Sequence, residues 1–211
     1  TEDGTFEHGT SVLRLEDPLE DLAQGERLVL EQAMPQLFHA RSERIAPDRD
    51  DKVLTGWNAM MIGAFARAGL AFADPEYTDA ATKAAQFLLD TLVRKEDGRL
   101  LRTWRDGKAQ LLAYADDYAF LVDALVDLHQ ATFDSKWLDH ALRLADEAVA
   151  LFWDTDGAGL FYTGSDHEQL VVRSKNLVGG AIPSANGTAA LAFARLAVLC
   201  GRDDLGAKAD S

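Results

Sequence analysis

The sequence contains very little cysteine. Cys200 is the only one among 211 residues, which excludes an internal disulfide and any Cys-x-x-Cys chemistry within this chain. It directly follows the apolar run 196–199. In such a setting we expect a buried and unreactive thiol.

Histidine is also scarce, and the common phosphate-binding and nucleophile motifs are absent. None of the five histidines has the spacing to another histidine, cysteine or carboxylate that is typical of zinc sites. The sequence has no glycine-rich phosphate loop and no Gly-x-Ser-x-Gly elbow. We therefore predict neither a metal nor a cofactor.

Positive charge is in short supply. The chain has 21 lysines and arginines against 35 aspartates and glutamates, a net charge of −14, and the basic residues are dispersed. Such a chain is a poor partner for nucleic acid or an anionic membrane surface. No run approaches the roughly 20 apolar residues of a membrane span. We expect neither nucleic acid nor membrane as a partner, and a cytoplasmic location.

The composition is that of a globular protein. Hydrophobic residues make up 47% of the chain and charged residues 27%, which argues against disorder. The length suits one good-sized domain over residues 1–211. Because the chain opens at Thr1 without a methionine, we expect it to be a piece of a longer protein.

One pattern occurs three times. Asn58, Tyr118 and Asn186 each lie in a polar or aromatic cluster just before a stretch of small apolar residues, with spacings of 60 and 68 residues. A repeat longer than about 50 residues with helical content is typical of stacked helical hairpins.

Hydrophobic periodicity predicts helices over about 19–44 (interrupted by Pro35), 54–71, 75–94, 116–132, 135–153 and 184–201. The predicted helix-capping residues are Asp74, then Asp116 or Asp117, then Asp134 or Ser135. Asp-Gly pairs predict turns and a short strand in 96–107 and again in 156–163. The last ten residues are polar, and we expect them to be frayed.

The predicted helices alternate between two types. Those at 54–71, 116–132 and 184–201 carry small apolar residues on several sides, whereas those at 75–94 and 135–153 have one polar face. Inner helices enclosed by outer helices form an (α/α) barrel. We therefore predict an all-α fold, a partial (α/α)6 toroid of about half a ring, with short strand-like loops between the hairpins.

Several dispersed motifs together resemble the spermatogenesis-associated protein 20-like family of thioredoxin-domain proteins. The main ones are Asp-Asp-Lys-Val-Leu-Thr-Gly-Trp-Asn (50–58), Asp-Asp-Tyr-Ala-Phe-Leu (116–121) and Pro-Ser-Ala-Asn (183–186). Phe-Glu-His-Gly-Thr (6–10), Phe-Trp-Asp (152–154) with Gly-Leu-Phe (159–161), and Arg-Ser-Lys (173–175) also fit, so the resemblance spans about residues 5–200. Ala59 and Ala185 stand where the family usually has glycine.

The resemblance implies a six-hairpin, glycosidase-like toroid, similar to glycosidases and N-acylglucosamine 2-epimerases, preceded by a thioredoxin-like domain. That thioredoxin-like domain is absent from this chain. The resemblance also implies that the chain begins inside the toroid and stops before the ring closes.

In a toroid, the loops that lead into the inner helices share one end of the central cavity. Asp116, Asp117 and Asp51 are the candidate catalytic carboxylates, because glycosidases use a pair of them. The alternative for Asp116 and Asp117 is helix capping or pairing with Arg173 and Lys175. For Asp51 it is an ion-pair cluster with neighbouring charges. A capping role would lower an aspartate's pKa and suit a base.

The candidate substrate-binding residues come from the same loops: Trp57, Asn58, Tyr118, Arg173, Lys175, Ser184 and Asn186. Trp57 and Tyr118 offer faces for stacking on a sugar, or else belong to the core. Arg173 and Lys175 suit an anionic group on the substrate, or else neutralise nearby acids. The two asparagines occupy equivalent repeat positions, which favours a structural role.

The resemblance implies an enzyme that hydrolyses or epimerises a sugar or sugar derivative, with a carbohydrate or another polar small molecule as ligand. The alternative is a non-catalytic scaffold or binding module that serves a thioredoxin-like domain. Half a ring leaves inner-helix faces uncovered, so we also expect a homo-oligomer or exposed apolar surface.

Overall fold

The computed structural model describes residues 12, 14–15 and 17–211, so the 6–10 motif lies outside the described residues. The chain divides into two units, Thr1–Asp50 and Asp51–Ser211. The first holds α1 (Gln24–Ser42), a single helix that runs through Pro35 and has no buried residue. The prediction of one domain over residues 1–211 stays a prediction.

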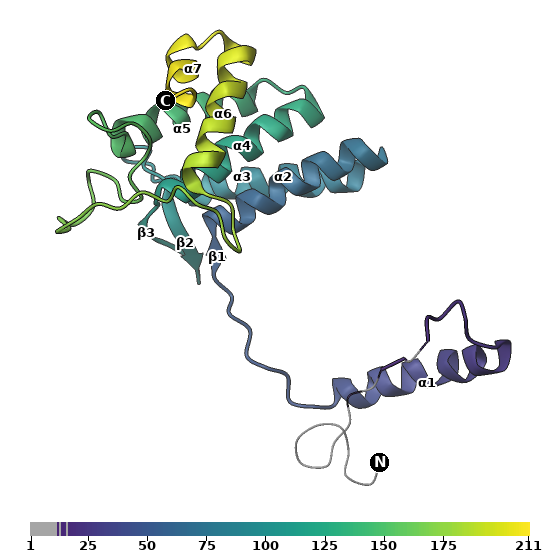
Figure 1. Cartoon of the computed structure of the whole chain (residues 1–211). Helices are drawn as coiled ribbons and strands as arrows, with labels where there is room; N and C mark the ends of the chain where they lie inside the picture. The colour runs from purple at the N-terminus through teal and green to yellow at the C-terminus, as the bar shows by residue number, and fades with distance from the viewer. Residues whose placement is uncertain (1–11, 13, 16) are drawn as a thin grey trace. The chain divides into compact units, whose positions relative to one another are not determined.

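The second unit carries three helical hairpins and a small sheet (Figure 1). Its elements in order are β1 (Val53–Leu54), α2 (Thr55–Phe72), α3 (Pro75–Thr91), β2 (Leu101–Arg105), β3 (Lys108–Leu112), α4 (Ala115–Thr132), α5 (Lys136–Phe152), α6 (Ala185–Cys200) and α7 (Asp203–Ala209). The sheet order is β1-β2-β3 and both pairings are antiparallel. Val53 pairs with Trp104, and Leu101 pairs with Leu112.

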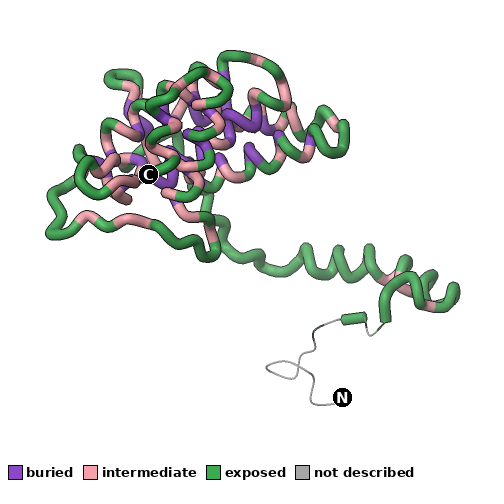
Figure 2. The backbone as a smooth tube through the Cα atoms, turned by 45° about the horizontal axis from the view of Figure 1, so that its top comes forward, coloured by how far each residue is buried: buried purple, intermediate pink, exposed green. Residues whose placement is uncertain are grey.

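The helices form two layers. The inner helices α2, α4 and α6 pack side by side, and each is followed by an outer partner, α3, α5 or α7. α4 lies between α2 and α6 and also packs on α5, so most of its residues are buried, as the purple part of the tube in Figure 2 shows. The described part of the chain is therefore predominantly helical, as predicted.

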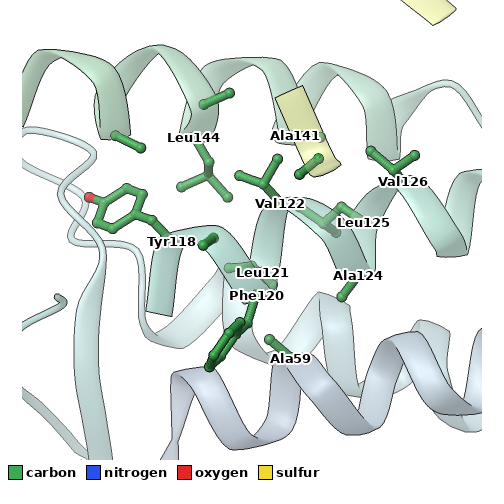
Figure 3. Close-up of a cluster of buried hydrophobic side chains, with 14 of the residues drawn as sticks. Ala59, Tyr118, Phe120, Leu121, Val122, Ala124, Leu125, Val126, Ala141 and Leu144 are labelled. Atoms are coloured by element: carbon green, nitrogen blue, oxygen red, sulfur yellow. The ribbon is translucent and has the colours of Figure 1, made fainter. Parts of the chain in front are cut away.

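The core is built around α4. Phe120 faces Ala59 of α2, while Leu144 and Ala141 of α5 cover the opposite side of α4 (Figure 3). Burying these apolar side chains contributes most of the driving force for folding, about 25 cal/mol per Å². The small residues of α2 and α6 let the inner helices approach closely, which holds the starts of α2, α4 and α6 near one another.

Most predicted boundaries hold to within a few residues. Asp74 caps α3 by accepting from the Glu76 amide at 2.9 Å, and Gly201 ends α6 in the left-handed conformation. Asp134 accepts from the Lys136 amide at 3.0 Å, as a capping residue of α5 would.

Three local predictions were wrong. The N-cap of α4 is Tyr114 rather than Asp116 or Asp117, although Asp117, in the first turn, accepts from the Tyr114 amide as the third residue of a capping box does. The predicted frayed end contains α7, which packs on α6 and buries Leu205. The segment 156–163 forms no strand beyond the single bridge between Trp153 and Leu160.

A carboxylate pair at the start of an inner helix

Asp116 and Asp117 are buried at the N-terminus of α4. Asp117, which is 2% exposed, accepts through Oδ1 from the Gly56 amide at 2.9 Å. Its Oδ2 accepts from the Tyr114 amide at 3.0 Å and from Arg102 Nη1 at 2.8 Å. One carboxylate thus joins the starts of α2 and α4, and strand β2 supplies its cation.

Asp116 shares the same arginine. Its Oδ1 lies 3.3 Å from Arg102 Nη1 and accepts from the Asp117 amide at 3.0 Å. The predicted alternative of pairing with Arg173 and Lys175 is therefore wrong, since the observed cation is Arg102. Sequence reasoning missed Arg102 because its partners lie 14 and 15 residues away, beyond any local pattern.

Burial dominates the electrostatics of Asp117. Loss of solvent and the adjacent Asp116 charge together raise the pKa of Asp117 to about 6, although Arg102 and two amide hydrogen bonds oppose this rise. The sequence argument expected capping to lower an aspartate pKa, and here desolvation outweighs it. A carboxyl that keeps its proton to about pH 6 is suited to donate a proton near neutral pH.

Aromatic rings flank the carboxylates. Tyr114 stacks on Tyr162 with ring centroids 4.9 Å apart and on His167 at 5.0 Å, and the Arg102 guanidinium lies 4.9 Å from the Tyr114 centroid. The Tyr162 hydroxyl donates to Asp116 Oδ2 at 3.4 Å. Burial raises the pKa of the Tyr162 phenol, so this group stays a donor. Neither Tyr114 nor Tyr162 was predicted from the sequence as a site residue.

Two hollows are lined by neighbours of the carboxylate pair, although neither Asp116 nor Asp117 lines them. One, of about 480 Å³, is lined by Tyr162, Lys175 and Leu177, among others. The other, of about 400 Å³, lies between α2, α4 and α6 and is lined by Met60, Phe120 and Thr188, among others. Phe120 follows Asp116 by one helical turn, so the second hollow continues along the face of α4 that carries Asp116.

An ion network crosses the far end of this second hollow. Asp127 of α4 is buried and pairs with Arg67 of α2 and with Arg195 of α6, the latter at 2.6 Å. Arg195 also pairs with Asp123 at 2.5 Å. Burial raises the pKa of Asp127, while its main arginine partner lowers it. The network ties the three inner helices together.

Tyr118 serves the core. Its ring is fully buried, and its hydroxyl donates to Glu147 at 2.7 Å and accepts from Arg99 at 2.8 Å. Arg99 in turn pairs with Asp166 at 2.7 Å. Tyr118 therefore offers no exposed face for stacking on a ligand, because α5 covers it.

The remaining predicted binding residues make contacts within the chain. Asn186 bonds both backbone groups of Leu160, and Ser184 caps α6. Arg173 donates to the carbonyls of Thr163 and Leu151, and Lys175 pairs with Asp154 at 2.7 Å. These groups hold the loop between α5 and α6, which carries Tyr162.

Three predicted site residues lie around the start of α2. Trp57 is 62% exposed, and the Asn58 amide donates to the Leu54 carbonyl at 2.9 Å. Asp51 is exposed on the approach to β1. Within the described residues, no group of three or more histidines, cysteines, aspartates or glutamates is arranged to hold a metal ion. No helix of this described part is long and apolar enough to cross a membrane.

Two curated relatives match nearly the whole chain. Spermatogenesis-associated protein 20 from Rattus norvegicus is 35% identical over 213 residues, which cover 93% of this chain and 27% of the relative. The Homo sapiens protein of the same name is 35% identical over 187 residues, with coverages of 84% and 24%. The chain thus spans about a quarter of the length of these relatives. No protein-family model matches it.

Solved structures share the fold. Cellobiose 2-epimerase from Spirochaeta thermophila superposes with a TM-score of 0.61 at 18% identity, over 89% of this chain and 54% of that one. An unsaturated glucuronyl hydrolase specific for heparin gives 0.60 at 19%, over 79% and 46%. An alpha-1,6-mannanase of Salegentibacter sp. gives 0.56 at 23%, over 76% and 45%. The fold is therefore a partial (α/α)6 toroid of the six-hairpin, glycosidase-like kind.

Proposed function

We propose that the chain belongs to the spermatogenesis-associated protein 20 family, and on that premise that it is the part of a carbohydrate-active toroid that holds a carboxylate pair. The proposed ligand is a sugar or sugar derivative, and the proposed reaction is hydrolysis or epimerisation. The family's thioredoxin-like domain and a cytoplasmic location belong to the same proposal.

The observation that carries this proposal is the pair Asp116–Asp117 at the start of the central inner helix. The Salegentibacter mannanase was solved with a mannotetrose as an inactive variant, in which two consecutive aspartates are replaced by alanine. Two consecutive aspartates in a shared toroid fold support, by analogy, a similar use here.

The chemistry fits an acid and its partner carboxylate. In glycoside hydrolysis one carboxyl protonates the leaving oxygen, while a second acts as nucleophile or base. Asp117 holds its proton to about pH 6, which favours it as the acid. Asp116, with the Tyr162 hydroxyl on its Oδ2, is the second carboxylate. The exposed ring of Trp57 is the proposed face on which a sugar ring stacks. Asp51 stays a further candidate for a catalytic carboxylate.

A specific observation favours the second candidate, a non-catalytic scaffold. Asp117, Tyr118 and Asn186 all satisfy their polar groups within the chain. Their contacts join α2, α4 and the loop between α5 and α6, as structural groups do. In this reading the toroid presents a surface to a thioredoxin-like domain and binds no sugar.

Ligand-induced thermal shifts separate the two candidates. We would test monosaccharides, disaccharides and sugar phosphates on the parent chain, on Asp116→Asn and on Asp106→Asn. Asp106 is exposed on the β2–β3 turn and serves as the matched control. A sugar at 100 times its Kd adds about 2.7 kcal/mol of stability, or roughly 5–11 °C in Tm for a chain of this size.

The carbohydrate proposal expects this shift in the parent, in Asp106→Asn and also in Asp116→Asn, because the mannanase variant that lacks both consecutive aspartates still holds its mannotetrose. A sugar that shifts the parent would then be incubated with it, and products followed by reducing-end assay and NMR. If no sugar shifts a folded parent sample, or if Asp116→Asn converts the sugar as fast as the parent does, the proposal fails. The scaffold reading would then stand.

A further inference from the structure

The chain leaves α3 and α5 through equivalent loops. A single β-bridge closes each loop, one ending at Leu100 and the other at Leu160, which lies 60 residues later. The amide of Leu100 donates to the Tyr118 hydroxyl at 3.1 Å. The amide of Leu160 donates in the same way to Asn186 Oδ1, at 2.6 Å. Tyr118 and Asn186 occupy equivalent repeat positions, so the inner helix that follows fixes each loop in the same manner.

Arg99 has no counterpart in the second loop. The equivalent residue, directly before Leu160, is Gly159, which lies in the left-handed region with a φ of 76°. Because a glycine closes that loop, the arginine side chain is not needed for closure. Yet Arg99 is only 4% exposed, and a guanidinium is costly to take out of water unless its donors are satisfied. The comparison indicates that Arg99 serves a contact that only the first loop makes.

Every N–H group of the Arg99 guanidinium has an acceptor. Nη1 donates to the Tyr118 hydroxyl at 2.8 Å and to the Leu100 carbonyl at 3.2 Å. Nη2 donates to the Ala113 carbonyl at 3.1 Å and to Asp166 Oδ1 at 3.2 Å, and Nε donates to Asp166 Oδ2 at 2.7 Å. Paired bonds of this bidentate kind fix the orientation of a carboxylate as well as its position. Asp166 is the charged partner among these, and it lies in the loop between α5 and α6.

Asp166 lies in a crowded turn, residues 162–167. The Gly164 amide donates to His167 Nδ1 at 3.0 Å, and the His167 amide donates to the Gly164 carbonyl at 3.2 Å. His167 Nδ1 also lies 3.3 Å from Asp166 Oδ1. A Cβ built on Gly164 would lie only 2.6 Å from Asp166 Oδ1 and 3.0 Å from His167 Nδ1. The shape of the turn and the orientation of the Asp166 carboxylate are therefore tied to each other.

The two ends of this turn carry aromatic rings that meet on Tyr114. Tyr162 opens the turn and stacks on Tyr114 with ring centroids 4.9 Å apart. His167 closes the turn and stacks on the same ring at 5.0 Å. The Tyr162 hydroxyl reaches Asp116 Oδ2 at 3.4 Å. A movement of the turn would therefore move the Tyr162 hydroxyl away from the carboxylate pair.

Backbone hydrogen bonds alone do not fix the Tyr162 ring. Its amide donates to the Ser174 carbonyl at 2.7 Å, and its carbonyl accepts from the Ala115 amide at 3.1 Å. These bonds hold the main chain of Tyr162 but leave its χ angles free to change rotamer. The direction of the ring is set by the stack on Tyr114, which the Asp166 end of the turn supports.

We propose that Arg99 is a positioning residue of the candidate site. Through its paired bonds to Asp166 it holds the turn, and the turn keeps the Tyr162 hydroxyl on Asp116. All of these contacts lie within the unit Asp51–Ser211. The inference rests on the proposed function only in the use that it gives to Asp116 as the second carboxylate, since the positioning itself involves no sugar.

The titration of the Tyr162 phenol reports where its hydroxyl lies. Burial and, after it, the charge of Asp116 raise the pKa of Tyr162, whereas Arg102 lowers it. A hydroxyl that leaves this contact for water should therefore titrate at lower pH. Fluorine NMR on protein labelled with 3-fluorotyrosine follows each of the four tyrosines, and Tyr162→Phe identifies the signal of Tyr162. The fluorine also lowers the phenol pKa, which brings the titration into a pH range where the protein stays folded.

Three variants disturb the proposed contact in different ways. Asp166→Ala removes the carboxylate. Arg99→Lys keeps the charge but cannot form the paired bonds, since an ammonium lacks the planar fork. Gly164→Ala keeps every charge and places a Cβ 2.6 Å from Asp166 Oδ1. In each variant Tyr162 should titrate at lower pH than in the parent, and the last two exclude a direct effect of a removed charge.

The first two changes should act through one contact. In the double variant Asp166→Ala, Arg99→Lys, the Tyr162 phenol should titrate as it does in Asp166→Ala alone, because residue 99 has already lost the partner through which it acts. Shifts that add in the double variant would come from independent effects and would overturn the inference.

Two matched controls test whether destabilisation alone moves the titration. Asp146→Ala removes a carboxylate that forms two hydrogen bonds with Arg202 and joins α5 to the segment before α7. Gly69→Ala places a Cβ 2.1 Å from Thr78 Oγ1, a clash of the same kind between α2 and α3. Both folded controls should keep the Tyr162 titration of the parent.

A Tyr162 signal that titrates as in the parent, in folded Gly164→Ala or Arg99→Lys, contradicts the inference. So does a pair of controls that lower the titration as much as the three variants do. The sugar screen fails or succeeds separately. The titration needs no sugar, so a chain that binds none can still show the positioning, and a chain that binds a sugar can still lack it.

Discussion

Replacing Asp117 by asparagine should change how stability depends on pH. In the folded chain, burial and the Asp116 charge raise the pKa of Asp117 from an ordinary 3.8 to about 6. Between these values the folded state keeps a proton that the unfolded state releases. The proton therefore stabilises the fold below about pH 3.8, and this stabilisation is lost as the pH rises towards 6.

The size of the effect follows from the same two values. A difference of one between the folded and unfolded pKa values corresponds to about 1.36 kcal/mol. The difference of about 2.2 for Asp117 therefore corresponds to about 3 kcal/mol of stability. The asparagine amide cannot titrate, so the Asp117→Asn variant lacks this pH dependence. The free energy of unfolding of the parent minus that of the variant should fall by about 3 kcal/mol between pH 3.5 and pH 7.

Urea unfolding of the parent and the variant, at pH steps of one half, measures this difference. The contributions of the other acidic side chains to the pH dependence cancel to first order, because both chains share them. Asp106→Asn, on the exposed β2–β3 turn, is the control for the removal of one aspartate charge at the surface. A parent-minus-variant difference that rises with pH would refute the reasoning. It would show that Arg102 and the two amide donors outweigh burial and lower the pKa.

Three further predictions concern packing. Asp127→Ala removes the shared partner of two arginines, but Arg67 is 60% exposed and Arg195 keeps its pair with Asp123, so urea unfolding should show a loss of about 1–3 kcal/mol. Trp137→Ala empties a fully buried site and should cost about 3–5 kcal/mol, whereas Trp57→Ala should cost under about 1 kcal/mol in the same assay. Gly69→Ala places a Cβ 2.1 Å from Thr78 Oγ1 and should lower Tm, and combining it with Thr78→Ala should recover part of the loss.

The helices were predictable because their signals are local. Asp74 before Pro75 gives both a capping residue and a favoured first-turn proline, and Gly201 supplies the left-handed end of α6. α7 was missed because only Leu205 marks its buried side. A seven-residue helix with one buried side chain has too little periodicity to detect.

The candidate site was only partly predictable. The repeat pointed to the start of α4, where Asp116 and Asp117 lie, but their cation and aromatic neighbours come from distant segments. Arg102 reaches them from β2 and Tyr162 from the loop after α5. No spacing rule connects such residues. Arg173 and Lys175 were chosen for their charge, their loop position and the Arg-Ser-Lys motif, and backbone carbonyls and Asp154 bind them instead.

The pairing of β1 with β2 has a consequence for how the chain tolerates being cut. Val53 pairs with Trp104, so strand pairing joins the two ends of the segment 53–104, which contains the whole α2–α3 hairpin. The exposed turn at Ala73, where the backbone is left-handed, lies at the other end of this closed loop. A protease cut there would sever the chain and leave both ends held by the strand ladder and by helix packing. Two separately produced pieces, 1–73 and 74–211, should therefore reassemble into one folded unit.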